Sequence, residues 1–159
     1  MAADPLANPE DAIRRVYAYV AYRIGAGPDA EDVVSDTIER ALRYRSSYDP
    51  RRGSPPGWLI GIAANCVSDH LRAGPARIDA DVEQVAGEEA DFAPRVESGL
   101  DLHDAVARLD ERDRELIALR YGADLKAKDI ARLLEMKPNA VEVALHRAIA
   151  RLRETMGEA

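Results

Sequence analysis

An all-α fold is the prediction for this chain of 159 residues. Aromatic residues make up only 5% of the sequence, and runs in which apolar and polar residues alternate as in strands are missing. Residues 79–99, DADVEQVAGEEADFAPRVESG, have no sustained apolar period and contain Gly, Pro and Ser, which predicts an acidic flexible linker. We therefore expect two small helical domains, residues 1–78 and residues 100–159, on either side of this linker.

Three helices are expected in the first domain. The first covers about residues 11–24 and stops at GAGP, and the second opens at residue 29 or 30. After the turn SSYDPRRGSPP, Ser54 caps a third helix with two prolines in its first turn, where their missing N–H groups cost nothing. This helix runs to about Arg72. The apolar residues expected to face the core are Ile13, Val16, Tyr17, Val20, Ile24, Val33, Val34, Ile38, Ala41, Leu42, Trp58, Leu59, Ile62, Ala63, Cys66, Val67 and Leu71.

The second domain begins with two more helices. Leu102, Val106 and Leu109 mark one of them, Asp110 caps the next, and Gly122 is expected to end that helix in the C′ position.

A short helix over residues 126–136, a break at Lys137-Pro138 and a long helix then follow with the spacing of a helix-turn-helix. If Asn139 is the N-cap of the long helix, Glu142 completes a motif close to a capping box. At 100° per residue, the inward stripe consists of Val141, Leu145, Ala148 and Leu152.

The net charge of −7 argues against a nucleic-acid partner, but its distribution does not. Residues 1–78 hold ten basic and ten acidic residues, residues 79–99 hold one and seven, and residues 100–159 hold eleven and twelve, so the linker carries most of the excess. The first domain also has a local basic patch opposed only by Asp49: Arg40, Arg43, Arg45, Arg51 and Arg52.

Several classes of protein are disfavoured by the composition. Cys66 is the one cysteine, so there is no disulfide framework, and it has no metal-ligand spacing with a histidine. No signal peptide or membrane-spanning stretch is apparent, and no cluster of residues has catalytic spacing. We expect a cytoplasmic protein without membrane insertion, enzymatic activity, metal or cofactor.

Two stretches carry a family resemblance. DAEDVVSDTIERALRYRSSYDPRRGSPPGWLIGIAANCVSDHLR resembles region 2 of the sigma-70 family in its extracytoplasmic-function (ECF) form. LDERDRELIALRYGADLKAKDIARLLEMKPNAVEVALHRAIARLR is similar to region 4 of the same family. Both occur in the right order with a linker of plausible length between them. The resemblance implies a promoter-specificity subunit that binds the beta and beta-prime subunits of core RNA polymerase, with promoter DNA and an anti-sigma factor as further partners.

Site residues follow from the resemblance to region 2. The resemblance implies docking on the polymerase clamp through Asp32, Asp36, Glu39 and Arg40, for which a merely solvated helix face is the alternative. Opening of the −10 element needs an apolar or aromatic pocket for a flipped base, an amide to read it and arginines for phosphates. Asn65 is the expected base reader, and we expect it to be a buried, helix-interior residue. Trp58 is better explained by core packing. The residues implied for −10 binding are Tyr48, Arg51, Arg52, Asn65, Asp69 and Arg72.

The helix expected to read the −35 element departs from the family pattern. Glu142, Val143 and Ala144 stand where relatives commonly have Lys-Ser-Arg, and Ala64 replaces a basic residue of region 2. Small apolar side chains can contact thymine methyl groups while basic side chains reach the backbone. We expect weak −35 binding with a shallow salt dependence. The residues implied are Lys126, Lys128, Lys137, Ala140, Val143, Arg147 and Arg151.

Two alternatives stay open on the sequence. A sigma-like decoy would bind an anti-sigma factor without reading promoters, as Glu142, Ala144, Ala64 and the net charge favour. Asn65 and the SYDPRRGS loop argue against a decoy, which would need neither. A dimeric helix-turn-helix repressor would leave the whole first domain unexplained.

Overall fold

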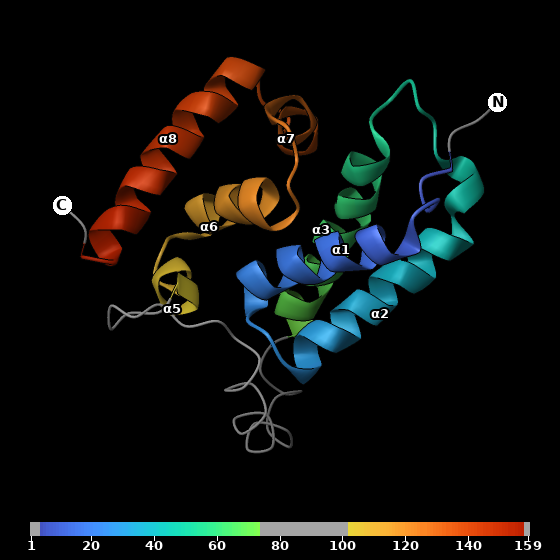
Figure 1. Ribbon diagram of the computed structural model, residues 1–159, viewed down its shortest axis with the longest axis horizontal. Coiled ribbons are helices and arrows are strands. Elements are labelled where there is room, and N and C mark those ends of the chain that lie inside the picture. Colours follow the sequence, from blue (N-terminus) through green and yellow to red (C-terminus); the bar gives the residue numbers. More distant parts are fainter. Residues whose placement is uncertain (1–3, 74–101, 158–159) are drawn as a thin grey trace.

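The computed structural model describes residues 4–73 and 102–157, and every regular element among them is helical (Figure 1). This confirms the predicted all-α class. The linker predicted at residues 79–99 and the boundaries at residues 78 and 100 lie outside the described residues. The elements are α1 (Pro9–Ile24), α2 (Pro28–Arg43), η1 (Arg45–Ser47), α3 (Pro55–Ala73), α5 (Leu102–Ala107), α6 (Glu111–Ile117), the π-helical turn η3 (Ala118–Gly122), α7 (Ala127–Leu134) and α8 (Pro138–Thr155).

Proline and a polar cap set the starts of the first helices. α1 begins at Pro9, two residues before the predicted start, and the Asn8 side chain accepts a hydrogen bond from the backbone N–H of Asp11. α2 begins at Pro28, immediately after the chain turns at Gly27 with φ of 130°. In both helices proline supplies the first position, where its fixed φ suits the helix and its missing N–H costs nothing. The predicted cap of α3 is confirmed, because Ser54 Oγ accepts the Gly57 N–H at 3.1 Å.

For three residues the predicted burial in the core is wrong. Ile13, Leu42 and Leu71 are each about half exposed, with 46%, 54% and 46% of their surface accessible. Each lies at the edge of an apolar stripe that is wider than the face the neighbouring helices cover, and periodicity alone does not locate that edge. The remaining predicted core residues of the first domain are buried or half-buried.

Gly122 does not have the role predicted for it. Asp110 caps α6 as expected, since its carboxylate accepts the Asp113 N–H at 2.9 Å. The helix then continues into η3, and Gly122 does not adopt the left-handed conformation of a C′ glycine. A Cβ atom at Gly122 would lie 2.7 Å from Tyr22 Cδ2 and 3.0 Å from the Ala18 carbonyl oxygen. Glycine is needed here because the backbone packs directly on α1.

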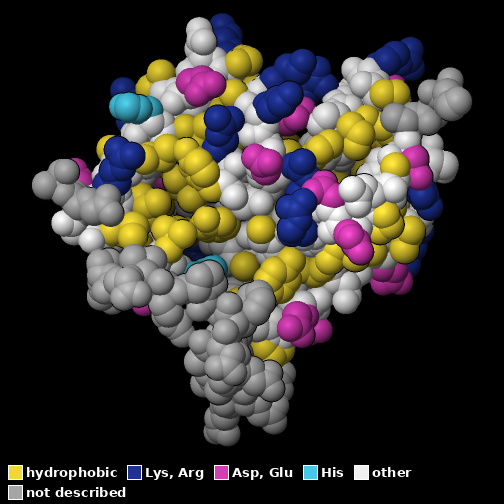
Figure 2. Space-filling model, viewed as in Figure 1, with side chains coloured by type: hydrophobic (Ala, Val, Ile, Leu, Met, Phe, Trp, Pro, Cys, Tyr) yellow, Lys and Arg dark blue, Asp and Glu magenta, His cyan; other side chains and the backbone are white. Residues whose placement is uncertain are grey.

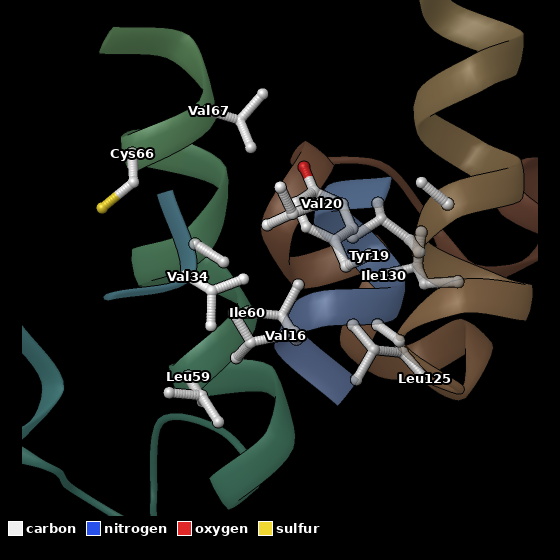
Figure 3. Close-up of a cluster of buried hydrophobic side chains, with 14 of the residues drawn as sticks. Val16, Tyr19, Val20, Val34, Leu59, Ile60, Cys66, Val67, Leu125 and Ile130 are labelled. Atoms are coloured by element: carbon white, nitrogen blue, oxygen red, sulfur yellow. The ribbon is translucent and has the colours of Figure 1, made fainter. Parts of the chain in front are cut away.

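The two halves of the chain share one hydrophobic core. Figure 3 shows Val16, Tyr19 and Val20 of α1 between α3 on one side and the C-terminal half on the other. Ile130 of α7 and Leu125 belong to the same buried cluster as residues of α2 and α3. Helix α1 therefore packs against both halves. A smaller cluster at the far end of the C-terminal half consists of Val106, Ile117 and Ala148.

Polar contacts also join the halves. Arg23 is 9% exposed, and its Nε lies 2.6 Å from Glu115 Oε1 while its Nη1 lies 3.2 Å from Glu111 Oε1. The Tyr19 hydroxyl donates to Glu115 Oε1 at 2.9 Å. Arg114 Nε donates to the Tyr22 carbonyl oxygen at 3.0 Å.

Among the described residues, no helix combines the length and the apolar character that a membrane span requires.

Candidate nucleic-acid interface

The loop before α3 is built around Tyr48. Its hydroxyl donates to the Gly53 carbonyl oxygen at 2.9 Å, which closes residues 48–53 into a compact turn. The Tyr48 ring meets Trp58 edge to face, with ring centroids 5.7 Å apart. Trp58 in turn packs against the core, which confirms the packing role predicted for it. The two aromatic rings thus give the loop a fixed shape.

A cleft of about 500 Å³ opens beside these rings. Tyr48, Arg52 and Trp58 form part of its lining from the N-terminal half. Asp129 and Arg132 of α7 form part of its lining from the C-terminal half. The sequence does not reveal these two residues, because α7 is predicted in the second domain and no local pattern places that domain relative to the first.

The loop arginines point outward. Arg51 and Arg52 are exposed, and Arg51 Nε lies 3.3 Å from Asp49 Oδ1. The Arg51 backbone N–H and guanidinium hold the pKa of the Asp49 carboxyl below its usual value. Figure 2 shows Lys and Arg side chains along the upper rim of the molecule, over α7 and over the loop before α3, with acidic side chains among and below them.

Asn65 lies on α3 as predicted but is exposed, so the expectation that it is buried is wrong. It lies on the opposite side of the helix from the buried stripe that contains Ala63 and Val67. An exposed amide is free to form hydrogen bonds with an incoming base without prior rearrangement of the core.

Asp69 is the centre of a small charge cluster at the end of α3. Arg40 Nη2 lies 3.3 Å from Asp69 Oδ2, and Arg72 forms an ion pair with the other carboxylate oxygen. The structure therefore brings together two residues predicted for −10 binding and one predicted for polymerase binding. Because the carboxylate partly neutralises both arginines, their attraction for phosphate is reduced in this arrangement.

The acidic residues of α2 form an outward face. Asp32, Asp36 and Glu39 are exposed, and Arg40 is half-buried. Thr37, on the opposite face, is fully buried and donates its hydroxyl to the Val33 carbonyl oxygen at 2.8 Å. The partition between the two faces leaves the acidic residues accessible to a partner.

The start of α8 differs from the prediction. The helix begins at Pro138 with Lys137 as the N-cap, and no side chain caps it. Asn139 is therefore the second helical residue, so the predicted capping box with Glu142 is wrong. The physical reason is Pro138, which fits the first helical position and moves the start of the helix two residues earlier. Glu142 is exposed within the helix.

The two faces of α8 agree with the helical wheel. Val141, Leu145 and Ala148 are buried, Leu152 is half-buried, and the inward stripe is confirmed. On the opposite side of α8, the exposed residues implied for −35 reading are Ala140, Val143 and Arg147. The lysines of α7 and the turn that are implied for the same contact are exposed as well: Lys126, Lys128 and Lys137.

Arg151 differs from the other basic residues of this group. Its Nη1 lies 2.8 Å from Asp113 Oδ2 and 3.0 Å from Asp113 Oδ1. Asp113 is only 4% exposed, and its hydrogen bond with Arg151 raises the pKa of the arginine. Arg151 therefore ties α8 to α6, a role that the wheel did not reveal because it depends on a residue 38 positions away.

No group of three or more His, Cys, Asp or Glu side chains within residues 4–73 and 102–157 could hold a metal ion. The chemistry of the described surface is that of charged and amide side chains around an aromatic cleft.

Comparisons with known proteins identify the family of this chain. Sigma-70 region 2 matches residues 10–75, and sigma-70 region 4 matches residues 99–152. The RNA polymerase sigma factor CarQ of Myxococcus xanthus is 31% identical over 91% of this chain and 84% of its own length. The chain belongs to the sigma-70 family, in its ECF form.

Other ECF sigma factors are similar to it. SigF of Caulobacter vibrioides is 31% identical over 91% of this chain and 81% of its own length. BldN of Streptomyces coelicolor is 31% identical over 86% of this chain, but the chain spans only 54% of that relative. The fold of this ECF sigma factor is similar to that of the sigma factor RpoE of Bartonella quintana, solved with the anti-sigma factor NepR. The TM-score is 0.69 at 21% identity, with 92% of both chains covered.

Proposed function

We propose that this ECF sigma factor binds core RNA polymerase through its beta and beta-prime subunits and directs promoter recognition, DNA opening and transcription initiation in the cytoplasm. One observation carries the proposal. Both DNA-reading regions of the family occur in order on one chain, and the likeness to CarQ extends over 84% of that relative. A protein that served only one of these steps would need only one of the regions.

The proposed −10 site combines the loop before α3 with the exposed face of that helix. Asn65 is the proposed base reader, and Tyr48 shapes the loop that carries Arg51 and Arg52. Asp69 and Arg72 continue the surface toward the end of α3. These side chains supply the amide, the aromatic ring and the cations that capture of a single strand requires.

The proposed polymerase contact is the acidic face of α2, formed by Asp32, Asp36 and Glu39 with Arg40 at its edge. An anti-sigma factor is proposed as a further partner, because the Bartonella factor with the same fold is bound to one.

The proposed −35 site is weak. Ala140 and Val143 offer apolar contacts to the major groove, and Arg147 with Lys126, Lys128 and Lys137 offers contacts to phosphates. Arg151 is also proposed to contact phosphate, although its pairing with Asp113 reduces its contribution. We expect the full chain to bind duplex DNA weakly without polymerase, with few counterions released. Tight binding to arbitrary duplex in a salt titration would contradict this expectation.

Run-off transcription with core RNA polymerase over a promoter library tests the function. We expect transcripts from a subset of promoters, and Asn65→Ala should reduce promoter opening by about tenfold or more, as the loss of one reading amide implies. Ser68→Ala, an exposed change on the same helix, is the matched control. A chain that binds core polymerase but opens no promoter would instead be the decoy considered from the sequence.

A further inference from the structure

The outward face of α8 begins with an amide. Four exposed residues recur along the helix at the spacing i, i+4, i+7 and i+11, which places them on one face, opposite the buried stripe. This outer stripe consists of Asn139, Val143, His146 and Ala150. Asn139 is its first member, and Figure 1 shows the start of α8 beside α7 at the upper edge of the molecule.

The Asn139 side chain has no structural task in the fold. It is not the N-cap, because α8 begins at Pro138, and no hydrogen bond joins its amide to another described residue. Asparagine is also a poor helix former, so the residue does not support the helix by its propensity. The amide therefore retains an acceptor oxygen and a donor nitrogen for an external partner.

The other two asparagines in the described part of the chain have different positions. Asn8 caps α1 with its side-chain oxygen, and Asn65 belongs to the proposed −10 site on α3. No glutamine lies within residues 4–73 and 102–157. Asn139 is therefore the single side-chain amide in the described C-terminal half, and it stands on the helix proposed to enter the major groove.

Charged residues on either side of the outer stripe orient it toward the bases. Glu142 and Arg147 are both exposed and lie about 140° apart around the helix at about 100° per residue, with the stripe between them. Phosphate attracts the guanidinium and repels the carboxylate. A helix that places Arg147 against the DNA backbone therefore turns the outer stripe into the groove and keeps Glu142 away from that row of phosphates.

The position of Asn139 along the helix also favours base contact. In helix-turn-helix proteins the N-terminal residues of the second helix contact base edges, and Asn139 is the second residue of α8. Lys137, directly before the helix, is exposed and available to an adjacent phosphate. We expect a short amide side chain at this position to reach the base edges.

Adenine is the base that an asparagine amide matches. In the major groove adenine presents the N7 acceptor beside the N6 amino donor, so the amide nitrogen donates to N7 while the amide oxygen accepts from N6. Guanine presents two acceptors, cytosine an amino donor, and thymine an acceptor with a methyl group, so none of them takes both hydrogen bonds. One bidentate pair of this kind corresponds to about tenfold discrimination or more.

We propose that Asn139 is the specificity-determining residue of the −35 site and that it reads an adenine. The inference rests on the proposed function, because it concerns recognition by the same helix. Val143 stands four residues on, about 6 Å along the helix axis, which is about two base pairs at about 3.4 Å each. Its contact with a thymine methyl group therefore falls within about two base pairs of this adenine.

Transcription from a promoter library tests the proposal. Core RNA polymerase with the full chain transcribes templates in which the −35 and −10 elements are randomised, and the transcribed templates are sequenced. We expect the wild type to enrich adenine about tenfold at one −35 position. Asn139→Ala should lose this enrichment at that position and should leave the −10 preference unchanged.

Asn139→Asp is the sharper variant. It keeps the size of the side chain but replaces the donor by an acceptor, and a carboxylate accepts from the cytosine N4 amino group while adenine N7 repels it. The preference should therefore change from adenine to cytosine at the same position, which a merely structural role would not produce. Glu154→Ala, at an exposed position near the end of α8, is the control and should keep the wild-type preference. Circular dichroism of each variant establishes that its helices are retained.

The possible outcomes separate this inference from the proposed function. Transcripts that show a −10 preference but no adenine preference at any −35 position would overturn the role of Asn139 and leave the proposed function intact. An adenine preference that persists in both Asn139 variants would assign the reading to another residue and would overturn that role equally. If no template were transcribed, the proposed function would fail, and the inference with it.

Discussion

At the scale of residues, two arginines show how one side-chain type serves different purposes on α8. Arg147 is exposed, and no ion pair joins it to another described residue. Arg151 forms two hydrogen bonds with the buried carboxylate of Asp113. A buried carboxylate that loses its partner keeps the cost of its desolvation, so we expect Arg151 to contribute to stability in addition to its proposed phosphate contact.

Alanine substitutions separate these two arginines. Arg147→Ala should weaken duplex binding while the free energy of unfolding stays within about 0.5 kcal/mol of the wild type, as for other surface positions. Arg151→Ala should lower the free energy of unfolding by clearly more than Arg147→Ala does, because Asp113 is left unpaired. Urea denaturation of both variants provides the measurement. Equal stability of the two would show that the Asp113 pair contributes nothing in solution.

At the scale of elements, the starts of the helices are set by proline and by polar caps. Asn8, Ser54 and Asp110 cap α1, α3 and α6 with their side chains. Helix α8 begins at Pro138 after Lys137, which provides no side-chain cap. The first N–H groups of α8 therefore remain available, and a lysine stands beside them.

The uncapped start of α8 predicts opposite effects on stability and binding. Lys137→Ser should stabilise the chain by about 0.5 to 1 kcal/mol, since serine at the N-cap accepts a hydrogen bond from the first turn. The same change should weaken duplex binding, because a proposed phosphate contact is lost. Thermal melting and fluorescence anisotropy measure the two effects.

Asn139→Ala is the control for this prediction. In the structure Asn139 is the second helical residue, so its loss should change stability little. A loss of about 1 kcal/mol or more would instead identify Asn139 as the N-cap and would contradict the observed start of α8.

At the scale of the whole molecule, α1 and the residues around Glu115 hold the two halves together. Burial raises the pKa of the Tyr19 hydroxyl well above its ordinary value of 10.0, and the neighbouring Glu115 carboxylate raises it further. The folded form therefore retains the Tyr19 proton at a pH where an exposed tyrosine loses it. Stability from this source is complete below pH 10 and decreases as the pH rises further.

An alkaline titration tests this contact. We expect the wild type to lose the contact between its halves progressively above about pH 10, the pKa of an exposed tyrosine. Tyr19→Phe, which has no proton to lose at that position, should retain this contact to higher pH. Tyr44→Phe changes an exposed ring and should behave like the wild type. Scattering and tyrosinate absorbance monitor the transition, and identical transitions in all three proteins would exclude a role for Tyr19.

Local features of the fold were predictable from sequence. The helical class, the caps at Ser54 and Asp110 and the inward stripe of α8 depend on residues within about one or two turns of each other, and periodicity and capping act over that range. The predictions are wrong where a neighbouring element decides the outcome. Gly122 has the spacing of a helix cap but is needed for close packing on Tyr22, and Asn65, predicted to be buried, is exposed.

The sequence by itself determined the helices, their order and the family to which the chain belongs, because short-range periodicity and two family motifs carry that information. Only the tertiary structure decided that α7 covers the loop before α3 and that Arg23 joins the halves. The physical reason is the distance along the chain. The Ser54 and Asp129 side chains are 75 positions apart, and neither carries a local signal that specifies the other as its partner.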